Sequence, residues 1–198
     1  MKGYRKPLQK ETTLPAFNLH TRRLNAPRDE VGALVDSLAG VHDRLWAGDL
    51  WREMRFDRPL GVGAIGGHGP VRYTVEAYEP GRWIRFRFTS PRGFDGFHEF
   101  TVHPRSPGVT DLHHLMAARL RSPAWMTYPL LWRPLHDALI EDTLDRAQRS
   151  LTGTVESPAR WSPYVRLLRK ILARTTIGES SSAPTRRTRA SALEGERK

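Results

Sequence analysis

Three histidines are the residues of this chain best suited to chemistry, because a neutral imidazole can exchange a proton or bind a metal ion near neutral pH. His98 and His114 lie in two segments that alternate between apolar and polar residues, each on the apolar side. A hairpin centred near Ser106 would join these segments and set His98 directly opposite His114. His136 falls within the apolar arc of a later helix. We therefore expect the three imidazoles to approach one interior volume.

Three roles are open for these histidines. They can line an otherwise apolar pocket or be satisfied within the core, as buried polar groups generally are. They can act as general acid and base on a bound carbonyl compound, because the ordinary pKa of histidine is about 6.5. They can ligate zinc, but the sequence has no paired motif such as H-E-x-x-H. We favour polar lining, keep His98, His114 and His136 as catalytic candidates, and expect neither a metal site nor a cofactor.

A glycine-dense stretch over residues 61–69 contains a fourth histidine of interest, His68. The stretch lacks the Lys-Ser/Thr ending of a phosphate-binding loop and does not open a helix, so phosphate binding is not expected. His68 either lies at the mouth of a cavity or is an ordinary turn residue.

The elements around these histidines follow an informative order. A strand is expected over residues 17–24, then a helix led by Pro27 and a second short helix over residues 42–51. From residue 71 the sequence alternates between apolar and polar positions through an uninterrupted run of strands. A long amphipathic helix is expected over residues 134–151. This order predicts an α+β fold in which a curved antiparallel β-sheet wraps around a long C-terminal α-helix, with two short helices after strand 1. Such an architecture usually encloses an apolar cavity.

The basic charge of the chain is concentrated at its ends. The net charge is +11, of which residues 1–16 contribute +3 (four basic, one acidic) and residues 152–198 contribute +6 (ten basic, four acidic). We expect a flexible basic tail over 1–16, a ligand-binding domain over 17–151, a linker and basic amphipathic helix over 152–177, and a disordered basic tail over 178–198. Because the central part carries little net charge, no specific nucleic-acid partner is expected. Nothing in the sequence indicates the oligomeric state.

The sequence has no cysteine, which excludes disulfides, thiolate catalysis and cysteine-ligated zinc but says little about the compartment. Residues 1–16 lack the apolar core of a signal peptide, and no stretch approaches the ~20 apolar residues that span a membrane. We expect a cytoplasmic protein, either free or peripheral to a membrane.

Several segments together resemble the START-like (SRPBCC) superfamily of helix-grip proteins, which includes polyketide cyclases, the Bet v 1-like birch-pollen allergens and lipid-transfer domains. The resemblance covers roughly residues 17–151 and begins with the order of the elements and the helix led by Pro27. The matching segments are Tyr78-Glu79-Pro80-Gly81-Arg82 before Ile84-Arg85-Phe86, Gly96-Phe97-His98-Glu99-Phe100, and Thr110-Asp111-Leu112-His113-His114. In that superfamily a curved sheet grips the last helix around a cavity for sterols, phospholipids, polyketides or hormones. Since its members include enzymes and passive carriers, the resemblance implies a cavity but no particular reaction.

Three functions are consistent with this resemblance. The first is noncatalytic binding or transport of a small hydrophobic ligand, such as a lipid or polyketide. The second is a cofactor-independent cyclase or dehydratase that uses the pocket histidines as acid and base. The third is a carrier or adaptor that docks on an anionic membrane surface through the basic helix at 161–174. The same helix can instead bind a protein groove or pack on its own domain, and we favour packing because an apolar stripe on a short helix is most often buried. The expected ligand-binding residues are Trp46, Tyr73, Phe86, Phe88, His98, Phe100, His114, Met116, Leu135, His136, Leu139 and Thr143.

Overall fold

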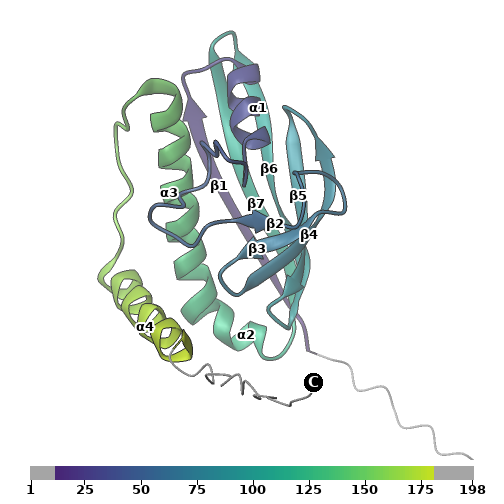
Figure 1. Ribbon diagram of the computed structural model, residues 1–198, viewed down its shortest axis with the longest axis vertical. Coiled ribbons are helices and arrows are strands. Elements are labelled where there is room, and N and C mark those ends of the chain that lie inside the picture. Colours follow the sequence, from purple (N-terminus) through teal and green to yellow (C-terminus); the bar gives the residue numbers. More distant parts are fainter. Residues whose placement is uncertain (1–11, 181–198) are drawn as a thin grey trace, which may run out of the picture.

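The sheet of this protein contains seven antiparallel strands and curves around a long helix. The computed structural model describes residues 12–180; residues 1–11 and 181–198 lie outside the described part. The strands follow the spatial order β1-β7-β6-β5-β4-β3-β2. Their bounds are β1 Leu14–Leu24, β2 Arg55–Phe56, β3 Ile65–His68, β4 Val71–Glu79, β5 Trp83–Ser90, β6 Phe94–Ser106 and β7 Val109–Leu120. Figure 1 shows the sheet and the helices that lie against its concave face.

The helices begin where the sequence supplies a start signal. In α1, Arg28–Asp36, Pro27 precedes the first turn and Asp29 and Glu30 lie near the positive end of the helix dipole. The long helix α3, Arg133–Thr152, is preceded without a break by α2, Ala124–Thr127, and by η1, a π-helical turn at Tyr128–Trp132. The last helix, α4, spans Pro163–Ser180, and its cap is Ser162, whose Oγ accepts a hydrogen bond from the Val165 backbone N–H at 3.2 Å. Among residues 12–180, no helix is both long and apolar enough to cross a bilayer.

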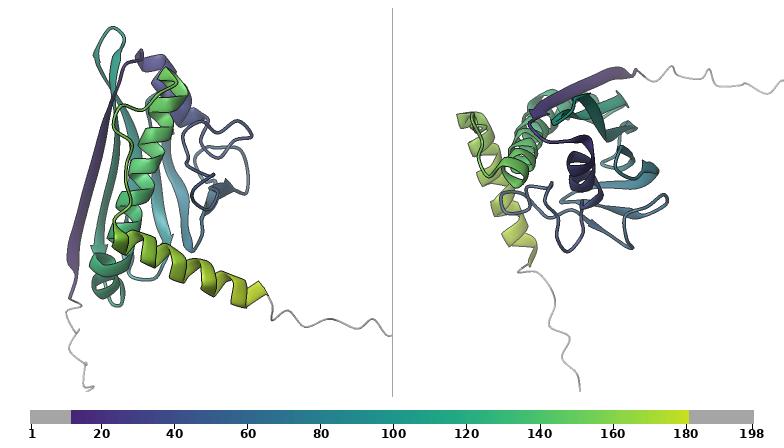
Figure 2. Two further views of the ribbon diagram at one scale, coloured as in Figure 1. Left: turned by 90° about the vertical axis from the view of Figure 1, so that its left-hand side faces the viewer. Right: turned by 90° about the horizontal axis from the view of Figure 1, so that it is seen from above.

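The concave face of the sheet packs against α1 and α3 as the alternation of the strands predicts. Tyr73 and Phe86 are fully buried on β4 and β5, as is Phe100 on β6. They belong to one core cluster with Leu139 and Leu144 of α3, and also with residues of α1. A second, smaller cluster gathers Ala16, Met116, Ala118, Leu120, Ala124 and Tyr128 near α2. The view from above in Figure 2 shows the sheet curving around these helices.

The β6–β7 register differs from the expected one by two residues. His98 pairs with Met116, and Phe100 pairs with His114, because the chain turns at Pro107-Gly108 rather than at Ser106 and the ladder shifts between Pro104 and Ser106. The prediction that His98 stands directly opposite His114 is therefore wrong. An even shift keeps each residue on the same face, so both histidines still point to the interior.

The segment at residues 42–51 forms consecutive turns, so the expected second short helix after strand 1 is not there. The carboxylate of Asp43 accepts hydrogen bonds from the backbone N–H groups of Ala39, Leu45 and Trp46. A side chain that binds nearby N–H groups in this way competes with the helical ladder. The segment still buries the side chain of Trp46 in the interior.

The glycine-dense stretch is partly a strand. A Cβ at Gly66 would lie 2.1 Å from the Arg55 carbonyl oxygen, and one at Gly67 would lie 2.0 Å from the Val71 carbonyl oxygen. Only glycine allows β2, β3 and β4 to approach this closely. These glycines therefore fold the edge of the sheet over the interior and carry His68 there.

Regular elements extend beyond the expected domain bounds at both ends. β1 begins at Leu14, three residues before the expected start, and α4 continues to Ser180. The rest of the expected tails, residues 1–11 and 181–198, lies outside the described residues.

Candidate functional site

A row of imidazoles crosses the interior between the sheet and α3. Nδ1 of His98 lies 3.2 Å from Nε2 of His114, within hydrogen-bond distance. The ring of His114 lies 5.1 Å from that of His136 on α3, measured between centroids. The ring of His136 in turn lies 5.9 Å from that of His20 on β1. The structure thus brings the three predicted histidines together and adds a fourth.

Aromatic side chains surround the inner end of this row. The His98 ring stacks on Phe86 and Phe88 at 4.9 and 5.1 Å and meets the edge of Tyr73 at 4.8 Å. His68 follows, with its ring 6.1 Å from Tyr73 and 4.7 Å from Trp46. His68 therefore lies against the interior aromatics rather than in an ordinary surface turn.

Many polar atoms in this interior have no hydrogen-bond partner among the described residues. They include Nε2 of His98, Nδ1 of His114, both ring nitrogens of His136, the Tyr73 hydroxyl and the Thr143 hydroxyl. Although the side chain of His136 is 19% exposed, both of its nitrogens are buried. An unpaired buried polar group costs roughly 1–3 kcal/mol, so this concentration is unusual for a purely structural core. The atoms are available to a polar group that enters the interior.

Burial keeps these histidines neutral. It lowers the pKa of His98 and His114 well below the ordinary value, and neighbouring imidazoles lower the pKa of both further. Burial also lowers the pKa of His136, although the nearby Asp137 carboxylate, 3.7 Å from Nδ1, opposes the shift. For His68, burial lowers the pKa to about 3. A neutral imidazole has one donor and one acceptor nitrogen, so the His98–His114 contact joins an N–H to an unprotonated nitrogen.

The outer end of the row is an ionic network between β1 and α3 that the sequence analysis missed. His20 Nδ1 lies 2.7 Å from Glu141 Oε1, and His20 Nε2 lies 3.3 Å from Asp137 Oδ1. Asn18 donates to the same Asp137 oxygen at 2.7 Å, and Arg22 bridges Glu141 and Asp145. Burial alone would lower the pKa of His20, but its hydrogen bonds to the two carboxylates outweigh this and raise the pKa to about 9. His20 is thus a cation at neutral pH.

Ligand atoms of His20, His136 and Asp137 lie within 4.8 Å of one another, close enough to reach one metal ion. The charges already balance without a metal, because protonated His20 bridges Asp137 and Glu141 while Arg22 and Arg133 approach the same carboxylates. A metal ion would have to displace the His20 proton beside two guanidinium groups. We therefore assign this cluster to ion pairing.

A signal for the network was present in the sequence. Asn18, His20 and Arg22 share a face of β1 with the buried Ala16 and Leu24. Asp137, Glu141 and Asp145 repeat every four residues along α3. The acids of an amphipathic helix are expected on the side away from the sheet, whereas these three face β1. Pairing the two polar stripes would have predicted the contact.

The expected ligand-binding residues form a closely packed interior. Tyr73, Phe86, Phe100, His114 and Thr143 are at most 1% exposed, and Trp46, His98, Met116, Leu135 and Leu139 are at most 9% exposed. Two surface grooves of about 430 and 520 Å³ lie near the β6–β7 hairpin, and none of the expected residues lines either of them. The role of these residues in ligand binding stays a prediction.

Comparison with known proteins defines the fold. No family model matches the sequence, and no curated protein matches it. Norcoclaurine synthase from Thalictrum flavum is similar in structure, with a TM-score of 0.56 at 13% identity, covering 75% of this chain and 100% of the synthase chain. CalU16 from Micromonospora echinospora gives a TM-score of 0.51 at 16% identity, covering 86% of this chain and 98% of its own. The protein therefore has the helix-grip fold of Bet v 1-like and SRPBCC structures.

Proposed function

We propose that the protein binds a small, mainly apolar molecule that carries hydrogen-bonding oxygens, between α3 and the concave face of the sheet. The main support is the set of buried, unpartnered nitrogens on His98, His114 and His136. A hydroxyl or carbonyl group among these nitrogens would satisfy them, while the surrounding aromatic side chains would contact an apolar skeleton.

The fold gives secondary support. Norcoclaurine synthase, which shares it, has been solved in complex with dopamine and hydroxybenzaldehyde, at a TM-score of 0.56 and 13% identity. Both are small aromatic molecules with polar substituents. The interior of the present protein is rich in the same kinds of partner, namely aromatic rings and imidazoles.

Native mass spectrometry of the purified protein, followed by identification of any molecule released on denaturation, tests this proposal. A complementary thermal-shift panel of phenols, fatty acids and polyketides should contain compounds that raise the melting temperature, because a ligand that binds only the folded state stabilises it. His114→Phe should abolish the shift, whereas the exposed matched control His103→Phe should keep it. If no molecule co-purifies and no panel member raises the melting temperature, the proposal fails.

The contact between His98 and His114 supports a second candidate, acid–base catalysis of the cyclase kind. In such a reaction the unprotonated imidazole nitrogen would remove a proton from a carbon between two carbonyl groups, and the N–H of a neighbouring imidazole would donate to the resulting enolate oxygen. Neutral imidazoles at hydrogen-bond distance are suited to both tasks.

Hydrogen–deuterium exchange at the acidic carbon of a bound 1,3-diketone, followed by NMR in deuterated buffer, tests this candidate. Wild-type protein should accelerate the exchange, and His98→Ala should remove the acceleration while the circular dichroism spectrum stays unchanged. If the diketone binds but its exchange is not accelerated, the catalytic candidate is refuted and only the binding function remains.

A further inference from the structure

Exposed apolar side chains gather at one end of the molecule. Within the described residues, fourteen large hydrophobic side chains are exposed, and half of them lie on α2, η1 and α4. These seven, which we call the end patch, are Trp125, Met126, Leu130, Tyr164, Leu167, Ile171 and Leu172. The two parts of the patch are joined by a hydrogen bond from the Tyr164 hydroxyl to the Leu130 carbonyl oxygen, 2.6 Å long.

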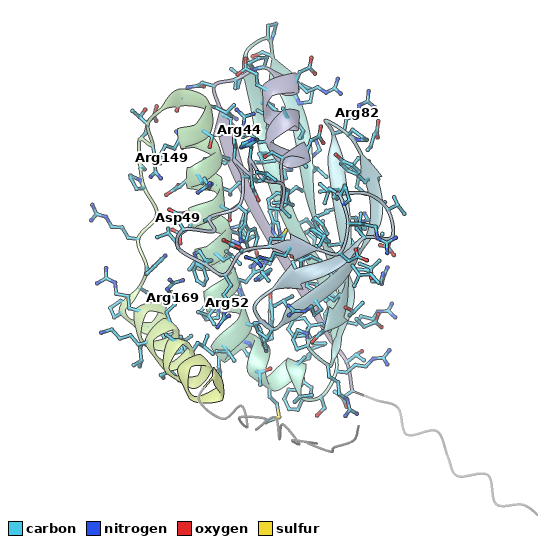
Figure 3. The ribbon with its side chains drawn as sticks, in the orientation of Figure 1. Arg44, Asp49, Arg52, Arg82, Arg149 and Arg169 are labelled. Atoms are coloured by element: carbon cyan, nitrogen blue, oxygen red, sulfur yellow. The ribbon has the colours of Figure 1, made fainter. Side chains whose placement is uncertain are left out.

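Helix α4 packs on the body through a side that includes Val165 and Arg169. Val165 is buried, and the guanidinium group of Arg169 lies between the rings of Trp51 and Trp161, at 4.1 and 4.0 Å from their centroids. The same group donates to the Leu50 carbonyl oxygen, and Figure 3 shows Arg169 at this junction. The contacts hold the helix in place while another of its faces stays uncovered.

The uncovered face is an apolar stripe. Tyr164, Leu167 and Ile171 follow one another at intervals of three and four residues, and each is at least 46% exposed. The exposed side chains of Arg166 and Lys170 lie along one side of this stripe. An apolar stripe bordered by cations is the pattern of a helix that lies in the interface of an anionic bilayer.

The charge around the patch is mainly positive. Residues 119–136 and 163–173 hold six arginines or lysines and no aspartate or glutamate. Two of these arginines have acidic partners outside the ranges, because Arg121 pairs with Asp95 and Arg133 approaches Asp137. The polypeptide also enters and leaves the described part at this end, because Leu14 pairs with Leu120 just before α2, and α4 is the last element (Figures 1 and 2). Residues 1–11, with four basic and one acidic residue, and 181–198, with five and two, attach there.

From this arrangement we infer that the end patch docks on the surface of an anionic lipid bilayer. Anionic headgroups complement a surface on which cations outnumber carboxylates. A second copy of the chain would bring the same cations against each other, which makes self-association through this patch less favourable. The inference is independent of the proposed ligand, since it uses none of the interior residues.

Co-sedimentation of the full-length protein with vesicles tests the inference. Vesicles of equal parts phosphatidylcholine and phosphatidylglycerol should bind the protein, and vesicles of phosphatidylcholine alone should bind it at least ~10-fold more weakly. The double variant Leu167→Glu/Ile171→Glu should lose at least ~10-fold in binding to the anionic vesicles, because it opposes both the apolar and the electrostatic contribution. The matched control is Val41→Glu/Val62→Glu, which changes two exposed valines elsewhere and should bind as the wild type does.

Three results would overturn the inference. The first is equal binding to both kinds of vesicle or to neither. The second is unchanged binding of the Leu167→Glu/Ile171→Glu variant, which would assign the affinity to the basic chain ends alone. The third is a dimer of the wild type in sedimentation equilibrium that the double variant dissociates, which would mean that a second copy covers the patch.

Discussion

His20 and Glu141, 121 residues apart, are joined by a contact of 2.7 Å between Nδ1 and Oε1 that ties β1 to α3. β1 is an edge strand of the sheet, and α3 is the helix around which the sheet curves. This ion pair therefore connects that edge of the sheet to the helix. It also forms the outer end of the imidazole row. One residue thus serves both the stability of the fold and the connection between the interior and the surface.

The raised pKa of His20 gives a first prediction, for alkaline pH. Its pKa in the folded protein is about 9, above the value of about 6.5 in the unfolded chain, so its stabilisation is complete below pH 6.5 and is lost as the pH rises through about 9. Between pH 6 and pH 10, the free energy of unfolding of the wild type should fall by on the order of 1–2 kcal/mol more than that of His20→Gln, a value reduced because the ion pair is partly exposed. Guanidinium unfolding at the two pH values measures this difference. Equal losses for the two proteins would contradict the proposed ion pair.

The neutral interior histidines give a second prediction, for acid pH. The pKa of His98 and of His114 lies below the unfolded value, so the unfolded chain binds more protons and stability falls as the pH drops below about 6.5. Each group can contribute up to about 1.4 kcal/mol per pH unit in that range. The double variant His98→Leu/His114→Leu should show a flatter dependence in urea unfolding between pH 7 and pH 5.

A variant that removes no titratable group provides the control for this second experiment. Met116→Leu changes the ladder partner of His98 but keeps every imidazole, so it should keep the wild-type slope of stability against pH. The prediction is refuted if the interior double variant and the control have the same slope.

Asp142 gives a third prediction, for the attachment of α4. Its Oδ2 accepts hydrogen bonds from the indole N–H groups of both Trp51 and Trp161, each 2.7 Å long. Asp142→Ala leaves two indole N–H groups without their acceptor and should cost about 2–3 kcal/mol. Amide exchange along α4 should accelerate more than exchange along α3, because the chain leading into α4 loses its anchor at Trp161.

A neighbouring acid serves as the control for the third prediction. Asp49 is largely exposed and pairs with Arg146 at the surface. Asp49→Ala should change stability by less than about 1 kcal/mol. If the two variants unfold alike and α4 is equally protected in both, Asp142 does not hold the helix.

Two glycines of the same stretch give a fourth prediction. A Cβ at Gly66 would meet the Arg55 carbonyl oxygen at 2.1 Å, whereas a Cβ at Gly61 meets its nearest atom, the Pro59 carbonyl oxygen, at 3.8 Å. Gly66→Ala should therefore destabilise the protein by about 2–4 kcal/mol, and Gly61→Ala by less than about 0.5 kcal/mol. Thermal unfolding of the two variants measures the difference, and similar melting temperatures would show that β2 and β3 do not approach so closely.

The parts of the fold that depend on local periodicity could be predicted from the sequence. Alternation along β4 to β7 correctly assigned Tyr73, Phe86, His98 and His114 to the inner face, and the 3.6-residue period correctly located α3. A period of two fixes a face even when the register is wrong, which is why the His98–His114 contact survived the two-residue error.

The parts that depend on competing or distant interactions could not be predicted in this way. The helix expected at residues 42–51 was lost to a single side chain, Asp43, which binds three backbone N–H groups. The contact of His20 with Glu141 joins two elements that are 121 residues apart, and the polar stripe on each element becomes a signal only when the two stripes are paired with each other. Unpartnered atoms such as Nε2 of His98 appear only when all neighbours are known.

Because Tyr73, Phe86 and Phe100 are tightly packed, opening the interior to a ligand costs free energy. These rings are in contact and must separate before a ligand can enter. The apparent affinity for a ligand is therefore the intrinsic affinity of the open conformation, reduced by the small fraction of molecules that adopt that conformation. A molecule without polar groups would gain little more contact energy than is lost when these side chains separate. A ligand with a suitably placed oxygen would also form hydrogen bonds with the unpartnered imidazole nitrogens. The closed interior would therefore favour apolar molecules that carry a polar group over molecules that carry none.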